Sequence, residues 1–199
     1  MRKNIFLFSG IAIFIFFSGF IPALAQDDNL TGRDRIAKQA ALSCRDEVIQ
    51  EMEKLVESNV VSFAGLFDTF YIPIPDTDPP KYHTQYDRHT DKVLRIILDK
   101  YLGQQSWFLY VVAADRNGYV PTHNSKYSKA LTDDPDYNLK HNRTKRIFND
   151  RTGLAAARNT DSYLLQEYKR DTGNTTADLS VPIYIRGKHW GAIRVGYEK

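Results

Sequence analysis

Cysteine is nearly missing from this sequence of 199 residues, which contains only Cys44. A single thiol cannot form a disulfide within the chain, so the fold must be stabilised by its core. The sequence also lacks a C-x-x-C-H motif, which excludes covalent attachment of c-type haem. Its five histidines never stand four residues apart, the spacing that would place two metal ligands on one helical face. We therefore expect no histidine-based metal site.

The sequence also has little net charge. The formal net charge is +3, and Arg2 and Lys3 are two of the 27 basic residues, which leaves 25 basic against 24 acidic residues in 26–199. Nucleic-acid-binding domains normally carry a strongly basic stripe. We therefore expect no nucleic acid partner.

The first 25 residues have the pattern of a secretory signal peptide. Two basic residues precede an apolar run over residues 5–20, and Ala23-Leu24-Ala25 forms a small-x-small cleavage site. The alternative is an uncleaved anchor, because the run over residues 5–24 reaches the roughly 20 residues that span a bilayer. We expect a periplasmic or secreted protein after cleavage, or one held at the inner membrane by residues 5–24 without it.

Apolar periodicity predicts two helices in the first half of the chain. Residues 34–70 repeat apolar side chains at steps of three and four, and Cys44 is expected to be a small packing residue on that stripe. Such a helix would extend roughly 55 Å at ~1.5 Å per residue, so we expect part of it to project or to form a homodimer. Prolines at 73, 75, 79 and 80 then break the helix, and residues 85–102 form the second one.

The second half of the chain is dominated by predicted strands. Turn signals at 115–118, 171–174 and 186–188 separate apolar and aromatic runs. The expected elements are strands at 107–112, 119–120, 163–169, 178–185 and 189–197, with a short helix at 138–149. The predicted class is α+β, a long N-terminal helix packed on a five-stranded antiparallel sheet. The predicted divisions are a signal peptide (1–25), the long helix (26–66) and a sensor domain (67–199).

A series of motifs in order resembles the sensor region of bacterial methyl-accepting chemotaxis proteins. The resemblance covers about residues 67–197 and is carried by the segments 67–75, 81–87, 118–124, 142–150, 168–173 and 187–191. It implies a single Cache module, which has a PAS-like sheet and binds a small molecule outside the cytoplasm. Departures at 155–157 and at Thr176 imply a changed ligand preference.

The sequence stops at Lys199, where a receptor would continue into a membrane span and a cytoplasmic coiled coil. We therefore expect a binding module without its own signalling domain, which presents a ligand to a membrane chemoreceptor, or a free-standing remnant. The alternative is a ligand-free partner that docks on a membrane receptor through its long helix.

Two arginines on the predicted 138–149 helix are the first candidates for a ligand contact. A guanidinium matches a planar carboxylate or phosphate, so we expect Arg146, and secondly Arg143, to anchor an organic anion. The alternative for Arg146 is a local ion pair with Asp150, four residues further on.

Four further candidates are a histidine and three aromatic residues. His123 ends a predicted strand, where it can donate to a ligand carboxylate or bond to the neighbouring backbone. Tyr110, Tyr168 and Trp190 lie on strands, where aromatic residues line small-molecule pockets or fill the core. We expect no cofactor, with noncovalent haem on His123 or His141 as the alternative. No nucleophile–base, carboxylate-pair or metal-ligand spacing is present, so we do not expect an enzyme.

Overall fold

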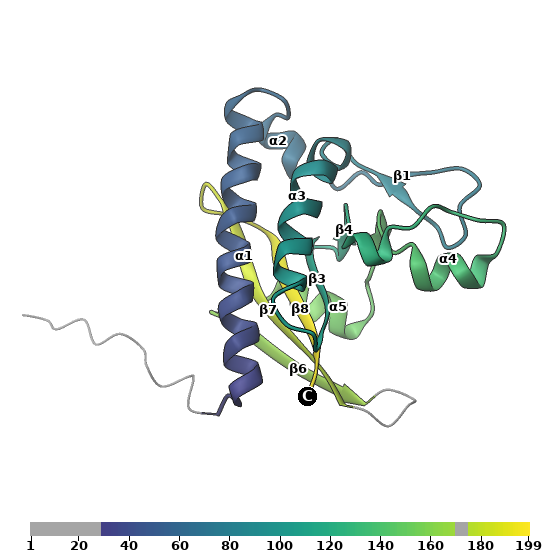
Figure 1. Ribbon diagram of the computed structural model, residues 1–199. Helices are drawn as coiled ribbons and strands as arrows, with labels where there is room; N and C mark the ends of the chain where they lie inside the picture. The colour runs from purple at the N-terminus through teal and green to yellow at the C-terminus, as the bar shows by residue number, and fades with distance from the viewer. Residues whose placement is uncertain (1–28, 170–174) are drawn as a thin grey trace, which may run out of the picture.

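The computed structural model describes residues 29–169 and 175–199, and its class is α+β as predicted (Figure 1). The predicted signal peptide and the predicted turn at 171–174 lie outside these residues. Within them, no helix is both long enough and apolar enough to cross a membrane.

Helix α1 (Gly32–Glu57) begins at a capping box in which the side chains of Thr31 and Asp34 each accept a hydrogen bond from the other's backbone amide. It is shorter than the predicted 34–70 helix. Asn59 adopts a positive φ of 57°, and the amide of Val60 turns back to the Leu55 carbonyl, so the helix cannot continue. The short α2 (Phe63–Leu66) follows. At ~1.5 Å per residue α1 extends only roughly 39 Å, and its buried stripe packs on the sheet.

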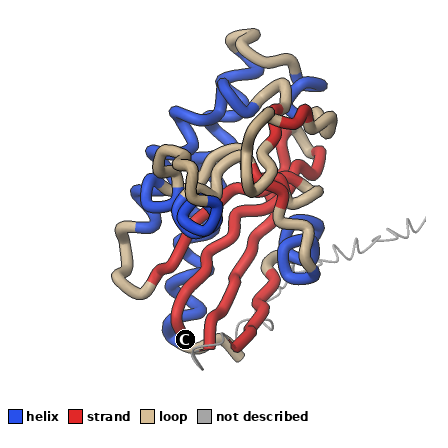
Figure 2. The backbone as a smooth tube through the Cα atoms, turned by 90° about the vertical axis from the view of Figure 1, so that its right-hand side faces the viewer, coloured by secondary structure: helices blue, strands red, loops and turns tan. Residues whose placement is uncertain are grey.

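The main sheet has four antiparallel strands in the order β3-β8-β7-β6, which lie side by side in Figure 2. Their bounds are β3 Phe108–Asp115, β6 Leu164–Lys169, β7 Thr175–Ile185 and β8 Lys188–Glu198. The β7–β8 hairpin turns at Arg186 and Gly187, both with positive φ, where the sequence predicted a turn. Helix α3 (Asp87–Leu102), close to the predicted 85–102, packs with α1 over one face of this sheet.

The prediction of a fifth strand in the sheet was wrong. Strand β4 (Tyr119–Val120) instead pairs with β5 (Arg146–Ile147) as a separate two-stranded ladder. The Asp115 carboxylate accepts the amides of Asn117 and Tyr119 and turns the chain away from β3. The side chain of Asn124 then accepts the Val111 amide at 2.9 Å, so it occupies a backbone donor that a fifth strand would need.

The predicted helix at 138–149 was also misplaced. Helix α4 (Pro135–His141) begins earlier, at an Asp134 cap followed by proline, and α5 (Arg151–Arg158) begins later. The intervening 142–150 segment is not helical: it turns at Thr144 and Lys145 and forms β5, because its amides bond to residues in and next to β4. Lys145 donates to the Val120 carbonyl, and Phe148 donates to the Gly118 carbonyl. A second small ladder pairs β1 (Ile72–Pro73) with β2 (Tyr82–His83), and a 3-10 turn spans Ser125–Tyr127.

Alternation along the strands gives the sheet two different faces. Residues such as Val181, Ile193 and Val195 belong to the main core beneath α1 and α3. The intervening side chains, including Tyr110, Val112 and Arg194, point to the opposite face, which α5 and the 142–150 segment partly cover.

Candidate functional site

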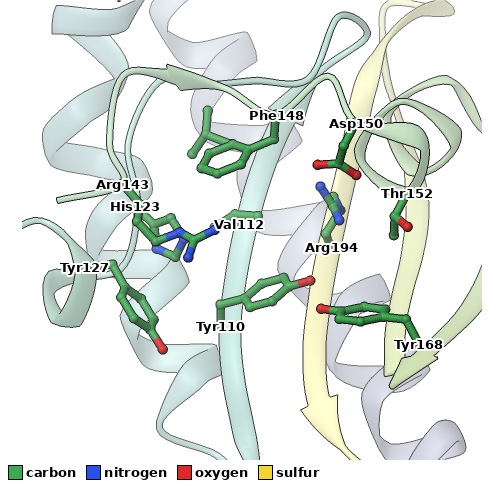
Figure 3. A pocket seen from close by; sticks show the side chains of 11 residues that line it. Tyr110, Val112, His123, Tyr127, Arg143, Phe148, Asp150, Thr152, Tyr168 and Arg194 are labelled. Atoms are coloured by element: carbon green, nitrogen blue, oxygen red, sulfur yellow. The ribbon is translucent and has the colours of Figure 1, made fainter. Parts of the chain in front are cut away.

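A cavity of about 380 Å³ opens on the sheet face that α1 does not cover (Figure 3). Strands β3, β6 and β8 supply its floor, and the 142–150 segment and the chain after β4 supply its walls. The lining residues are Tyr110, Val112, Val120, His123, Tyr127, Arg143, Phe148, Asp150, Thr152, Tyr168 and Arg194.

Three residues from three neighbouring strands form a hydrogen-bonded floor. Arg194 donates to one oxygen of Asp178 from Nε at 3.1 Å and from Nη2 at 2.5 Å, and the Tyr110 hydroxyl donates to the same oxygen. Burial lowers the pKa of Arg194, but the Asp178 carboxylate outweighs burial and the pKa is raised. Burial and the same carboxylate raise the pKa of Tyr110. At neutral pH the floor therefore contains an arginine cation and a neutral tyrosine donor.

Gly196 allows Tyr110 to lie flat on β8. A Cβ at this position would stand 2.1 Å from Cε1 of the Tyr110 ring, closer than real contacts allow. The glycine is therefore needed for the tyrosine to reach Asp178 across β8, which lies between their two strands.

His123 is a neutral donor in the cavity wall. Its Nδ1 accepts the backbone amide of Asn124 at 2.8 Å, so the proton of the neutral ring is on Nε2. Burial and the positive charge of Arg143 hold the pKa of His123 well below its usual value. Within the described ranges no acceptor takes the Nε2 proton, which leaves it for a ligand. The same tautomer leaves Nε2 without a lone pair for haem iron.

Arg143 is a cation without a carboxylate partner among the described residues. Its backbone amide donates to the Tyr127 carbonyl at 2.7 Å, which holds the 142–150 segment beside the 3-10 turn. Its guanidinium lies 5.1 Å from the centre of the Phe148 ring, a cation–π contact that uses none of its N–H groups as hydrogen-bond donors. Figure 3 shows Arg143 and His123 at one end of the cavity, with Arg194 and Asp150 at the other.

Four of the six residues predicted to bind a ligand line this one cavity: Tyr110, His123, Arg143 and Tyr168. Arg146 does not line it. Its guanidinium also lies over Phe148, at 5.1 Å, and donates to the Leu139 carbonyl at 3.3 Å. The alternative pairing of Arg146 with Asp150 is not formed either, since Asp150 caps α5 by accepting the Gly153 amide.

Trp190 and His141 also lie outside the cavity lining. Trp190 is buried in the main core, where its Nε1 donates to the Leu66 carbonyl at 2.9 Å and satisfies the indole. His141 ends α4 and packs against Tyr137 with ring centres 4.4 Å apart. Residues 29–169 and 175–199 contain no cluster of three or more His, Cys, Asp or Glu side chains suited to a metal ion.

The floor pair of Arg194 and Asp178 was missed at the sequence level. Both residues interrupt apolar strands, Arg194 between Ile193 and Val195, and Asp178 between Ala177 and Leu179. A charged residue in the middle of such a strand is buried only when it is paired, and this signal could have indicated the pair. Asp150 and Thr152 carried no comparable signal.

Comparison with known proteins finds a distant likeness among solved structures. No family model matches the chain, and no curated protein matches it. Among solved structures, the chain is similar to an extracellular ligand binding receptor from Desulfohalobium retbaense DSM5692, with 14% sequence identity and a TM-score of 0.35. The similarity covers 81% of this chain and 24% of that one, so this chain spans about a quarter of the receptor's length.

Proposed function

We propose that this protein is a ligand-binding module that takes a small organic carboxylate into the cavity beside Arg143. The observation that carries the proposal is the pairing of Arg143, a cation without a carboxylate partner in the described residues, with His123, a neutral Nε2–H donor at the same end. A guanidinium fork and a second N–H are suited to the two oxygens of a carboxylate.

The balance of donors and acceptors favours an anion over a cation. The Asp178 carboxylate is already occupied by Arg194 and Tyr110, so its charge is neutralised within the floor. Asp150 uses one carboxylate oxygen for the Gly153 amide. The unused donors of Arg143 and His123 are concentrated at the opposite end, where an acceptor group of the ligand would satisfy them.

The remaining walls favour an organic body over an inorganic anion. Val112, Val120 and Phe148 form a small apolar cluster at the cavity, and Tyr110 adds the face of its ring. Small-molecule pockets of ~300 Å³ and above typically combine such apolar walls with a few polar groups that fix the ligand's orientation. A carboxylate with a short apolar or hydroxylated body suits both parts.

We propose that binding of the ligand serves a sensory role. The resemblance of residues 67–197 to the sensor region of methyl-accepting chemotaxis proteins supports that role, with a membrane chemoreceptor as the partner. We propose that the ligand is released unchanged, because no hydroxyl in the described residues hydrogen-bonds to the His123 ring.

Thermal unfolding and calorimetric titration with sodium salts of pyruvate, succinate and benzoate test this proposal, with sodium chloride and sodium sulfate as inorganic controls. A carboxylate at 100 times its Kd stabilises the protein by about 2.7 kcal/mol. Arg143→Ala should abolish this gain. Arg35→Ala removes an equal charge from an exposed position on α1 and should leave it unchanged.

Two results would contradict the proposal. One is a carboxylate that binds Arg143→Ala as tightly as the wild type. The other is a panel in which nothing binds, which would favour the hypothesis of a ligand-free partner that docks on a receptor.

A further inference from the structure

Lys81 is a buried lysine with an unusual set of partners. Its side chain starts just before β2, and only 4% of the residue's surface is exposed. The ammonium donates to Oδ1 of Asn142 at 2.6 Å, to the Asn142 carbonyl at 3.2 Å and to the Thr144 carbonyl at 2.7 Å. Within the described ranges, no carboxylate lies within 4.0 Å of it.

A buried ammonium held only by neutral oxygens is costly to keep charged. Burial, with the nearby charges of Arg146 and Lys145, lowers the pKa of Lys81 to about 8. A leucine or methionine would fill the space without this cost, although it would leave three acceptors unpaired. Ionisable groups kept in such settings are more frequent at functional sites than elsewhere.

The three acceptors of Lys81 lie on both sides of Arg143. Asn142 precedes the arginine, and Thr144 follows it. Asn142 also donates from Nδ2 to the Lys129 carbonyl at 2.6 Å, and the Arg143 amide donates to the Tyr127 carbonyl. Lys81 thus fixes the backbone of the segment that presents Arg143. Its charge also acts on the cavity, because it is one of the cations that lower the pKa of His123.

We propose that Lys81 is the positioning residue of the carboxylate site, whose ammonium binds the residues on either side of Arg143 and keeps the guanidinium at the cavity. This inference rests on the proposed function, since Arg143 is the anchor of that site. Lys81 itself does not line the cavity, so it acts through Arg143 and through its charge.

The role of Lys81 makes ligand binding sensitive to alkaline pH. Two cations of the 142–150 segment act on it, Arg146 and Lys145, and Lys145 is itself paired with Asp87 and Asp91. A bound carboxylate favours the charged ammonium, so binding takes up a proton above about pH 8. Affinity then falls by at most about tenfold per pH unit.

Stability should move in the opposite direction over the same range. The pKa of Lys81 lies near 8 in the folded chain, below the 10.5 of an unperturbed lysine. Between these values the unfolded chain binds more protons, so the free energy of unfolding rises with pH. A purely structural lysine would not weaken ligand binding while the fold gains stability.

The test begins without a ligand or a mutation. In NMR spectra of the purified wild-type chain from pH 6.5 to 9.5, the amides of Asn142, Arg143 and Thr144 should titrate together with a midpoint near 8. In Lys81→Met, hydrogen exchange at the Arg143 amide should become about tenfold faster or more, because hydrogen bonds from a charged donor are lost. Lys140→Met, which removes an exposed charge from the last turn of α4, should change neither the amide titration nor the exchange at Arg143. If Lys81→Met does not fold, the titration of the wild-type amides still tests whether Lys81 is coupled to the segment that carries Arg143.

The second arm is calorimetry with pyruvate, succinate and benzoate at pH 7 and 9.5. The tightest of the three should bind wild type at least tenfold more weakly at the higher pH, and the loss should vanish in Lys81→Met. Two results would overturn the role of Lys81 and leave the proposed function standing. One is hydrogen exchange at the Arg143 amide that does not change in Lys81→Met. The other is a set of wild-type amide shifts that do not change with pH in a protein that binds a carboxylate. A panel in which nothing binds would refute the proposed function, and the role of Lys81 in binding with it.

Discussion

Replacement of Gly196 by alanine is the sharpest test of how the cavity floor is built. The added Cβ would stand 2.1 Å from Cε1 and 2.3 Å from Cζ of Tyr110, so the ring must move off β8. The backbone beneath cannot yield easily, because Gly196 is paired with β3 on one side and with β7 on the other. Overpacking of this kind costs about 1–3 kcal/mol. Displacement of the ring also breaks the hydrogen bond to Asp178.

The assay is thermal unfolding combined with titration of a carboxylate. At about 2–4 °C per kcal/mol for a chain of this size, the thermal midpoint should drop by several degrees. Affinity should fall because the ring enters the cavity. Gly32→Ala, whose new Cβ meets nothing within 4 Å, is the matched control and should lower neither the thermal midpoint nor the affinity.

A double-mutant cycle isolates the contact between the added methyl group at position 196 and the Tyr110 ring. If the clash with Tyr110 causes the loss, Gly196→Ala should cost much less in a Tyr110→Leu background, where the ring is absent. An equal cost in both backgrounds, or no cost in the wild type, would refute the account of the floor.

Three further substitutions test other parts of the structure. Asp178→Ala leaves Arg194 buried without its carboxylate, so urea unfolding should show a loss of about 3–5 kcal/mol; a loss near zero would contradict the buried pair. Burial raises the pKa of Asp87, but the hydrogen bonds with Lys145 and His83 and the positive charge of Lys145 together outweigh burial, and the pKa is lowered. The stability that Asp87 contributes is thus present above pH 3.8 and lost as pH falls through the lowered value, so Asp87→Asn should destabilise at pH 7 and much less in strong acid. Trp190→Phe should lower the free energy of unfolding by about 1 kcal/mol, because the hydrogen bond to the Leu66 carbonyl is lost, and should leave carboxylate affinity unchanged. Weaker carboxylate binding by this variant would show that Trp190 belongs to the binding site.

Periodicity in the sequence was sufficient to predict the helices and strands whose backbone conformation follows from the local pattern of apolar residues. Helix α3 and strands β6, β7 and β8 lie close to their predicted positions, because alternation and amphipathic spacing directly reflect burial. The errors arise where distant groups decide the backbone. The side chain of Asn124 occupies the Val111 amide, and the amides of the 142–150 segment pair with residues 118–127. Neither contact is visible in local propensity.

The candidate site was also only partly predictable from the sequence. Guanidinium chemistry and position after a strand indicated Arg143 and His123, and both line the cavity. Arg146 was predicted ahead of Arg143, but the helix on which both were expected does not form, and Arg146 does not line the cavity. Lys81 and Arg194 depend on strand order and on contacts across more than 60 and 15 residues respectively, which one sequence does not reveal.

The most direct test of the central claim is a crystal structure of the protein grown with the tightest carboxylate of the panel. The account predicts a carboxylate group bound by the Arg143 guanidinium and by Nε2 of His123, with the organic body against Phe148 and Tyr110. Ligand density elsewhere, or a carboxylate held at the Asp150 end without Arg143, would contradict it.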